Sequence, residues 1–496
     1  MHTLPGEEGQ VDFFQGAPTL DATTGQCKSG QITCQESAVE SLVSDSGLDS
    51  CPMPAPSAVR PALPWLLAAL VLGLGLVLAT RVYHNYDVVD CFLAWARATG
   101  GFRPWGVYTP GTGADDCDYP PLVPYLLTLG EAGRLAAGAP AVGALAILLL
   151  KLPSLLAHAA TVPLSLRGLA RPLGPAGARR AAILLALSPA FFLNAALWGQ
   201  FDVPLTLFLI AAVAALLCDR PVAAGVGMGL ALATKLLAIV PVPLLAVWVW
   251  RRHGPRELAR STGAGLLVVV ILALPHVVAG RGEAMLRAYT GAVNYYPFRT
   301  GEAYNTWYLL DRYDVLARGM SPPLARRDDR PALGPITYHQ VGLAAFSLYT
   351  VFMLAALARR PTPIVLLWTL GMHLFGFFML PTQVHQRYIV PAVGLLALLA
   401  PLSHRGLVLF GVLTATATLN QALDLVRALP LESAVAGALT APQMPLALRT
   451  ARDLGAGIAL VNFLLFAWAL VAFWREAVAP VGGTAVGSPA PGTGAR

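Results

Sequence analysis

The run PALPWLLAALVLGLGLVLAT, residues 61–80, has no charged side chain in twenty positions. A helix needs about 20 apolar residues to cross the hydrocarbon core of a bilayer. We therefore expect a membrane-spanning helix here. No basic-then-apolar signal peptide precedes the run, so this span is expected to act as its own insertion signal.

Similar apolar runs recur along the chain. Its residues are 56% hydrophobic and only 12% charged, with a mean hydropathy of +0.61, whereas soluble domains carry about 25% charged residues. The sequence predicts an all-α fold, a polytopic transmembrane helix bundle of about 12 spans with outer-face loops. The expected spans are 61–80, 141–165, 180–198, 203–218, 221–235, 236–250, 261–279, 338–357, 362–380, 388–402, 406–422 and 455–474.

The spans define the expected domains and their orientation. Residues 1–58 are polar and aperiodic, which predicts a disordered cytoplasmic tail; 59–475 form the transmembrane domain; 476–496 form a second disordered cytoplasmic tail. With both termini inside, every short inner loop carries Arg, as the positive-inside rule requires. No basic patch interleaved with aromatic residues indicates nucleic acid. The segment 119–137 is short and broken by Pro, so we expect an interfacial helix.

Acidic residues follow the first span, in the stretch DVVDCFLAWARATGGFRPWGVYTPGTGADDCDYPPLVP (87–124). Carboxylates beside a membrane are costly and therefore indicate a site. Asp87 and Asp90, three residues apart, would share a helix face, and a partly desolvated carboxylate suits a general base. The alternative is a solvated helix whose acids pair with Arg97 or Arg103.

The end of this stretch presents another acid. Two prolines after Asp118-Tyr119 stiffen the turn and would fix the direction of Asp118. Clustered oxygens could also bind a divalent cation, or the segment is a flexible acidic loop tip. No cofactor is predicted with certainty. Cys91 and Cys117 lie in the same outer loop, where a disulfide bridge can form.

Three further segments carry polar residues on the expected outer face. Trp198, Gln200 and Asp202 occupy a tight turn between two spans, which favours lining a site over simple interfacial anchoring. The long loop 280–337 contains Tyr304, Asn305 and Trp307, which could bind a sugar by stacking and hydrogen bonds. Otherwise these are ordinary loop aromatics.

Cationic side chains accompany them. His385 and Arg387 begin a span and could cradle a phosphate, Arg387 through its bidentate guanidinium group. Lys235 is either a second phosphate ligand or a lysine that extends to the membrane surface. The sequence contains no P-loop, dinucleotide glycine motif, His-Glu-x-x-His motif or serine elbow.

In combination these motifs resemble the GT-C glycosyltransferases over residues 60–475. Asp87, Trp95 and Asp118-Tyr119-Pro120-Pro121 are similar to the first outer loop of that superfamily. The stretches Trp198–Asp202 and His385–Tyr388 resemble the WGQxD and HERY-like motifs of bacterial relatives of the second mannosyltransferase of GPI-anchor assembly. The DYPP step is also similar to the dolichyl-phosphate-glucose glucosyltransferases. The family Asp could correspond to Asp87 or Asp90, and the usual Glu of the last motif is Gln386 here.

The resemblance implies a reaction and partners. Such enzymes take a sugar from a polyprenyl phosphate donor in the lipid bilayer and transfer it to a glycan or lipid-linked acceptor on the outer face. It implies that Asp87 or Asp90 removes the acceptor proton, that Arg387, His385 and Lys235 bind the phosphate, and that Trp95, Asp118, Tyr119, Trp198, Gln200 and Asp202 contact the substrates.

The sequence therefore predicts a bacterial inner-membrane hexosyltransferase, with mannose as the favoured sugar, an inverting mechanism and a role in the cell envelope. The alternative from another class is a transporter or flippase of lipid-linked sugars. Transporters place polar residues near the bilayer midplane, often in repeated halves, whereas here polar residues gather at the expected outer rim and no internal repeat is detectable.

Overall fold

The computed structural model describes the strands at 19–20 and 27–28 and residues 62–80, 87–112, 116–291, 297–428 and 443–479. The chain divides into two units, Met1–Pro61 and Ala62–Arg496. In the first unit, β1 (Thr19–Leu20) and β2 (Cys27–Lys28) form an antiparallel pair. Most of the predicted N-terminal tail, and residues 480–496 of the predicted C-terminal tail, lie outside the described residues.

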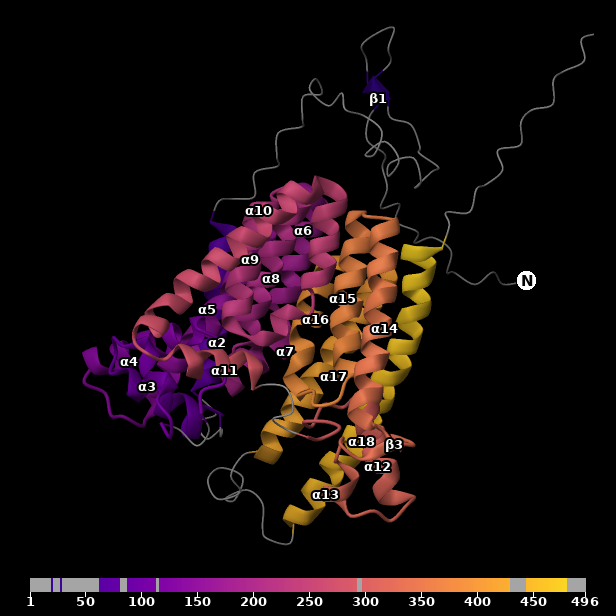
Figure 1. The fold of residues 1–496 in the computed structure, drawn as a ribbon. Coiled ribbons are helices and arrows are strands. Elements are labelled where there is room, and N and C mark those ends of the chain that lie inside the picture. Colours follow the sequence, from indigo (N-terminus) through magenta and orange to yellow (C-terminus); the bar gives the residue numbers. More distant parts are fainter. Residues whose placement is uncertain are drawn as a thin grey trace, which may run out of the picture. The chain divides into compact units, whose positions relative to one another are not determined.

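The second unit is helical (Figure 1). Its long helices are α2 (Leu63–Ala79), α4 (Leu122–Ala136), α5 (Ala144–Gly168), α6 (Ala170–Ala186), α8 (Asp202–Leu217), α9 (Pro221–Thr234), α10 (Val242–Val278), α14 (Tyr338–Arg359), α15 (Pro363–Met379), α16 (Val390–Leu399), α17 (His404–Ala428) and α18 (Gln443–Phe473). The all-α fold class is confirmed.

Shorter elements connect these helices. They are η1 (Asp87–Phe92), α3 (Leu93–Thr99), η2 (Pro104–Tyr108), α7 (Pro189–Phe192), η3 (Leu193–Trp198), η4 (Leu236–Ile239), α11 (Gly282–Thr290), α12 (Thr306–Leu316), α13 (Pro322–Ala325), β3 (Pro331–Leu333), β4 (Ile336–Thr337), η5 (Gln386–Ile389) and η6 (Trp474–Val478). Strands β3 and β4 pair antiparallel just before α14. Thr337 then begins α14 with a reciprocal capping box to Gln340.

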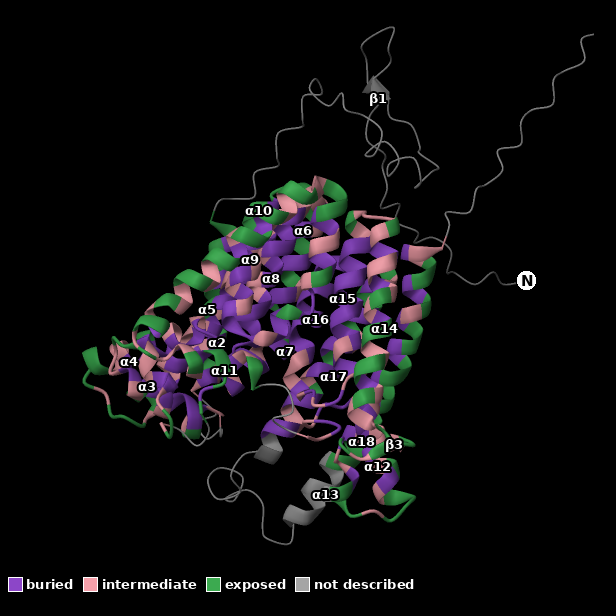
Figure 2. Cartoon of the chain, viewed as in Figure 1, coloured by how far each residue is buried: buried purple, intermediate pink, exposed green. Residues whose placement is uncertain are grey.

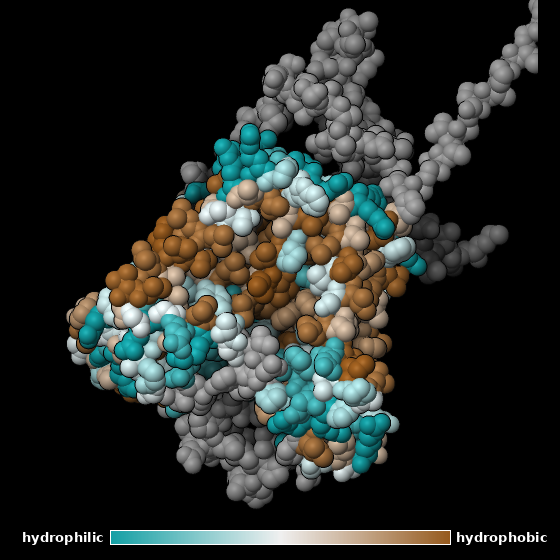
Figure 3. All heavy atoms as spheres, in the orientation of Figure 1, coloured by the Kyte–Doolittle hydropathy of each residue, from teal (hydrophilic) through white to brown (hydrophobic). Residues whose placement is uncertain are grey.

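The helices have the lengths and composition of membrane spans. Five described segments pass as spans on length and hydropathy, and the bent pair α6 and α7–η3 makes six. Five shorter apolar helices join them: α2, α8, α9, α15 and η5–α16. The predicted twelve spans are reached only when these shorter helices are included and α10 is counted twice. Figure 3 shows apolar side chains forming a band between two hydrophilic ends.

Helix α10 consists of two helices, and the predicted spans at 236–250 and 261–279 correspond to its two halves. They join within the segment Val242–Val278 at Gly254, whose backbone is not helical. Gly254 adopts a positive φ of 84°, which favours glycine, and Pro255 begins the second half. The connection is therefore a sharp bend with no loop of its own.

Close packing of α9 on α10 depends on small residues. A Cβ atom at Gly225 would lie 2.0 Å from the carbonyl oxygen of Ser261, and one at Gly229 would lie 2.4 Å from that of Gly265. Small residues spaced four apart on both helices let their backbones touch, as is usual where helices meet in membranes. Helices α15 and α16 lie in the interior, where almost every residue is buried (Figure 2).

Candidate active site

Polar side chains meet at one end of the bundle, where several helices begin or end. η1 follows the first span, the η3–α8 turn joins two spans, Lys235 follows the last residue of α9, and η5 leads into α16. The sequence predicted that these segments share one face, and the structure brings them together. The contacts below join residues up to 300 positions apart.

Asp87 is a focus of these contacts. Its Oδ2 atom accepts a hydrogen bond of 2.8 Å from the indole Nε1 of Trp198 and another from the amide of Gln200. The Nη1 atom of Arg387 lies 3.9 Å from the same oxygen. The Asp87 side chain is 24% exposed, so this held carboxylate remains open to solvent or to a ligand.

The turn from Trp198 to Asp202 supplies these donors because of its backbone geometry. η3 is a π-helix that ends at Gly199, whose φ of 85° requires a residue without a side chain. The turn buries Trp198 and Gln200, and Gln200 accepts a 2.7 Å hydrogen bond from the hydroxyl of Tyr119. The DYPP step and the WGQxD-like motif, 81 residues apart, are therefore directly linked.

A buried ion pair lies beside this turn. Lys235 donates from Nζ to Asp202 Oδ1 at 2.7 Å, and the side chains are 10% and 0% exposed. The other oxygen of Asp202 accepts from Asn194 Nδ2 at 3.1 Å, and the same Asn194 amide donates to Gln421 Oε1. The backbone of Lys235 is extended between α9 and η4. This interruption of the helix directs the Lys235 side chain towards the site.

Lys235 and Arg387 also face aromatic rings. The Lys235 ammonium lies 5.8 Å from the centre of the Tyr119 ring and 5.2 Å from that of Tyr388. The Arg387 guanidinium lies 5.9 Å from the Trp198 ring. Such cation–π contacts hold a cation in place while leaving its hydrogen-bond donors available for an anion.

His385 lies two residues before Arg387 in the sequence. Burial lowers the pKa of His385 well below its usual value, and the positive charges of Arg387 and Lys235 lower it further. The imidazole is therefore neutral at neutral pH. It can donate a hydrogen bond to a phosphate, but it adds no positive charge to such a site.

Asp118 lies near the same charges. Its side chain is exposed to solvent, although many atoms of the protein surround the carboxylate. This desolvation raises the pKa of Asp118 above its usual value, and the charges of Arg387 and Lys235 act in the opposite direction. Asp118 therefore belongs to the electrostatic surroundings of Asp87 and Arg387.

Other residues of the opening loop take different positions. Trp95 is 2% exposed and packs against Phe92 and Tyr119. It therefore helps to hold Tyr119 in place. Asp90 is exposed, whereas Trp198, Gln200 and Arg387 all contact Asp87. Cys117 is a buried free thiol, so the bridge to Cys91 considered from the sequence is not formed. Asp115 lies outside the described residues.

The loop segment that was predicted to stack on sugar is largely buried. Tyr304 and Trp307 are 5% and 8% exposed, and Asn305 is 0% exposed. The carbonyl of Tyr304 accepts from Asn462 Nδ2, and Trp307 Nε1 donates to the carbonyl of Leu380. This arrangement favours a structural role for all three residues, and their sugar contact stays a prediction.

Asn305 allows these two roles to be separated. Its side chain caps α12 by accepting from the backbone N–H groups of Trp307 and Tyr308, and its Nδ2 donates to the Phe378 carbonyl. We expect Asn305→Ala to cost about 1 kcal/mol or more of stability with no direct effect on substrate affinity. Thermal unfolding in detergent and the Michaelis constant check this. A raised Michaelis constant at unchanged stability would return Asn305 to the binding site.

Several site residues were not predicted from the sequence. Asn194 and Gln421 bridge Asp202 to α17, and the buried carboxylate of Asp424 accepts from Gln386, a motif position that the sequence had shown. Their only sequence signal is a polar side chain in an apolar helix, which buried polar residues on many helices share.

The divalent cation considered from the sequence finds no ligand set among the described residues, where no group of three or more His, Cys, Asp or Glu side chains could hold a metal ion.

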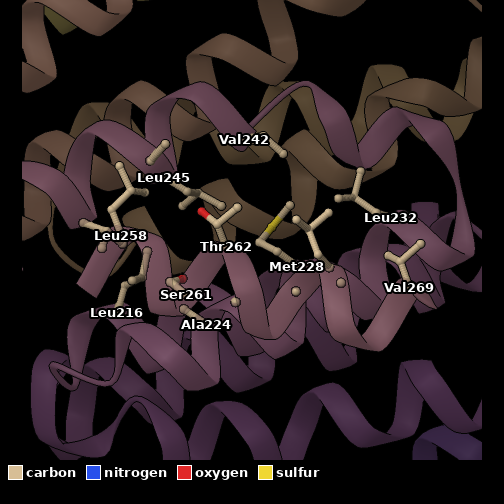
Figure 4. A pocket seen from close by; sticks show the side chains of 16 residues that line it. Leu216, Ala224, Met228, Leu232, Val242, Leu245, Leu258, Ser261, Thr262 and Val269 are labelled. Carbon is tan, nitrogen blue, oxygen red and sulfur yellow. The ribbon is translucent and has the colours of Figure 1, made fainter. Parts of the chain in front are cut away.

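An apolar pocket of ≈ 200 Å³ lies between α9 and the two halves of α10. Figure 4 shows Met228 and Leu232 of α9 and Val242 and Val269 of α10 around it. Leu232 is three residues before Lys235, so α9 links this pocket to the ion pair of the site.

The fold and site define a polytopic membrane protein with a carboxylate and cations gathered at one end of its bundle. The model of Glycosyltransferase family 87 matches residues 119–381, more than half of the chain. The chain belongs to this family. The predicted GT-C glycosyltransferase superfamily is confirmed, and the matched region includes Trp198, Gln200, Asp202 and Lys235 but not Asp87 or Arg387.

Two solved structures are distantly similar to this chain. ArnT from Cupriavidus metallidurans bound to undecaprenyl phosphate is 16% identical, with 83% of this chain and 76% of that chain covered and a TM-score of 0.44. AglB from Archaeoglobus fulgidus, in complex with an inhibitory peptide and a dolichol-phosphate, is 14% identical, with 81% and 56% covered and a TM-score of 0.38. No curated protein matches the sequence.

Proposed function

We propose that this glycosyltransferase moves a hexose, with mannose favoured, from a polyprenyl-phosphate donor to a lipid-linked or cell-envelope glycan acceptor. The reaction takes place on the outer face of the cytoplasmic membrane, and both termini are cytoplasmic. The observation that carries the proposal is the meeting of Asp87 and Arg387, 3.9 Å apart, beside the Lys235–Asp202 pair. A base for an acceptor hydroxyl and cations for a phosphate thereby share one site.

The reaction follows from these positions. Asp87 accepts the proton of the acceptor hydroxyl, whose oxygen forms a bond to the anomeric carbon of the sugar. The bond from that carbon to the phosphate oxygen breaks, and the lipid phosphate leaves with the electron pair. Attack opposite the leaving group inverts the anomeric centre. Phosphate departs most easily when its charge is stabilised, which is the role of Arg387 and Lys235, with a hydrogen bond from His385.

Substrate contacts are assigned by position. Asp118, whose side chain is exposed, and Tyr119, whose hydroxyl is fixed by Gln200, are assigned to the sugar or the acceptor. The apolar pocket beside α9 suits the isoprenoid chain of a lipid-linked donor, because it offers apolar surface on the helix that ends just before Lys235. This pairing of apolar and cationic regions supports a lipid phosphate over a nucleotide sugar.

The direct test is transfer in membranes containing the full-length protein. Labelled polyprenyl-phosphate hexoses, including mannose and glucose, are supplied one at a time, and incorporation into lipid-linked and envelope glycans is measured. We expect one donor to be used and the stereochemistry of the product to be inverted. Transport of the donor across the bilayer without formation of a glycosidic bond would instead establish the flippase alternative.

Arg387 provides a sharper prediction. Removing its guanidinium in Arg387→Ala should raise the donor Michaelis constant about 10- to 100-fold, because hydrogen bonds to charged groups are among the stronger ones. Arg387→Lys should recover only part of this, since lysine lacks the bidentate fork. Arg287→Ala, at a 59% exposed side chain of α11, is the matched control. Unchanged donor affinity in Arg387→Ala would remove Arg387 from the phosphate site.

A further inference from the structure

Lys151 is a buried cation that the proposed chemistry does not use. It lies within α5, is 1% exposed, and is among the largest fully buried side chains of the protein. A lysine within an apolar span is costly unless its ammonium group has good partners. Its Nζ donates a 2.9 Å hydrogen bond to the backbone carbonyl of Leu197, at the end of η3.

Ser154, one turn further along α5, makes a second hydrogen bond to the same turn. Its hydroxyl donates a 2.7 Å hydrogen bond to the backbone carbonyl of Gln200. Residues three apart on a helix share a face, so one face of α5 binds the carbonyls on both sides of the Trp198–Gly199 step. Carbonyls at a helix end lack partners within the helix, and the carbonyl of Leu197 finds one in Lys151.

The side chains of Lys151 and Val88 also pack closely against the backbone of Gly199. A Cβ atom there would lie 2.9 Å from Lys151 Cγ and 3.2 Å from Val88 Cγ2. The stem of Lys151 and the neighbour of Asp87 therefore pack on the same backbone. α5, η1 and the η3–α8 turn meet at one point, and the two side chains directed from this turn to Asp87 are Trp198 and Gln200.

We propose that Lys151 and Ser154 are positioning residues for the transfer reaction. Their hydrogen bonds to the carbonyls of Leu197 and Gln200 keep the turn in the conformation in which Trp198 and Gln200 both donate to Asp87. The proposal rests on the proposed function, in which Asp87 is the base. Lys151 acts through the turn and does not contact the substrate.

The experiment compares full-length variants in membranes. Lys151→Met keeps the length of the stem without a donor, Lys151→Gln restores a neutral donor, and Ser154→Ala removes the second contact. Thr161→Val is the control, because Thr161 is also buried on α5 but donates only to the carbonyl of His158 in its own helix. Two readouts are taken: transfer kinetics, and labelling of Asp87 by a carbodiimide, measured by mass spectrometry without any substrate.

We expect kcat to fall about 10- to 100-fold in Lys151→Met, and by less in Ser154→Ala, with the donor Michaelis constant nearly unchanged. Lys151→Gln should recover part of the loss. Labelling of Asp87 should rise in Lys151→Met and Ser154→Ala, since Trp198 and Gln200 no longer cover its carboxylate. Thr161→Val should match the wild type in both readouts.

Different results overturn different claims. Wild-type kcat and labelling in Lys151→Met would disprove the positioning role and leave the proposed function intact. Full transfer by Asp87→Asn would remove the proposed base, while altered labelling in Lys151→Met would still support control of the turn. If Lys151→Met fails to fold, Ser154→Ala and Lys151→Gln decide the matter, and unchanged Asp87 labelling in both would contradict the proposal.

Discussion

Replacement of Asp87 by Asn should abolish measurable glycosyl transfer, with a loss of about 10²–10⁴-fold or more, the range attributed to a positioned general base. The change is small in structure. An asparagine oxygen can still accept the hydrogen bonds of Trp198 and Gln200, so the turn should keep its place. What is lost is a group that takes up the acceptor proton.

The control for this variant is Glu283→Gln on α11, where an 87% exposed carboxylate is removed. Expression and apparent Tm of both variants should match the wild type. Asp90→Asn addresses the alternative left open by the sequence, and we expect it to retain activity because the donors converge on Asp87. Loss of transfer in Asp90→Asn together with an active Asp87→Asn would move the base to Asp90.

The sequence predicted the fold class because the length of each apolar run can be read directly from consecutive residues. Each run near 20 residues requires its backbone hydrogen bonds to be satisfied within the segment, which in a bilayer means a helix. The residues at which the helices begin and end were less predictable. The two halves of α10 extend into the polar residues at 251–260, because Gly254 and Pro255 turn the chain between them without a loop.

The site was predictable where unusual residues occur at span ends. Asp87, the Trp198–Asp202 turn and Arg387 each stand out beside an apolar run, and the orientation of the spans predicted that they share one end. Contacts inside the bundle were not predictable. Lys151, Asn194 and Gln421 lie on apolar helices. Only tertiary packing shows that Lys151 binds the turn, that Asn194 binds Asp202 and that Gln421 binds Asn194.

The loop around Tyr304 shows a different limit. An aromatic and polar loop can cover a ligand or fill a gap between helices, and its composition is the same in both cases. Here the backbone of the loop is held by Asn420 and Asn462, which donate to the carbonyls of Glu302 and Tyr304. The burial that results comes from α17 and α18, more than a hundred residues away in sequence.

Replacement of Lys235 by Met is expected to destabilise the protein strongly. Lys235→Met leaves Asp202 buried at 0% exposure without its cation, and breaking a buried ion pair from one side costs about 3–5 kcal/mol. The apparent Tm in detergent should therefore fall by several degrees. Asn194 Nδ2 still donates to Asp202 in this variant, but one amide donor does not replace an ammonium group.

The double variant Lys235→Met with Asp202→Asn separates stability from function. Removing both charges eliminates the unpaired buried carboxylate, so most of the lost stability should return. Donor binding should not return, because the proposed phosphate ligand is still absent. A stable double variant with wild-type donor affinity would show that Lys235 serves only to neutralise Asp202. A stable but inactive one would place the lysine at the phosphate, with Asp202 holding it in position through the 2.7 Å contact.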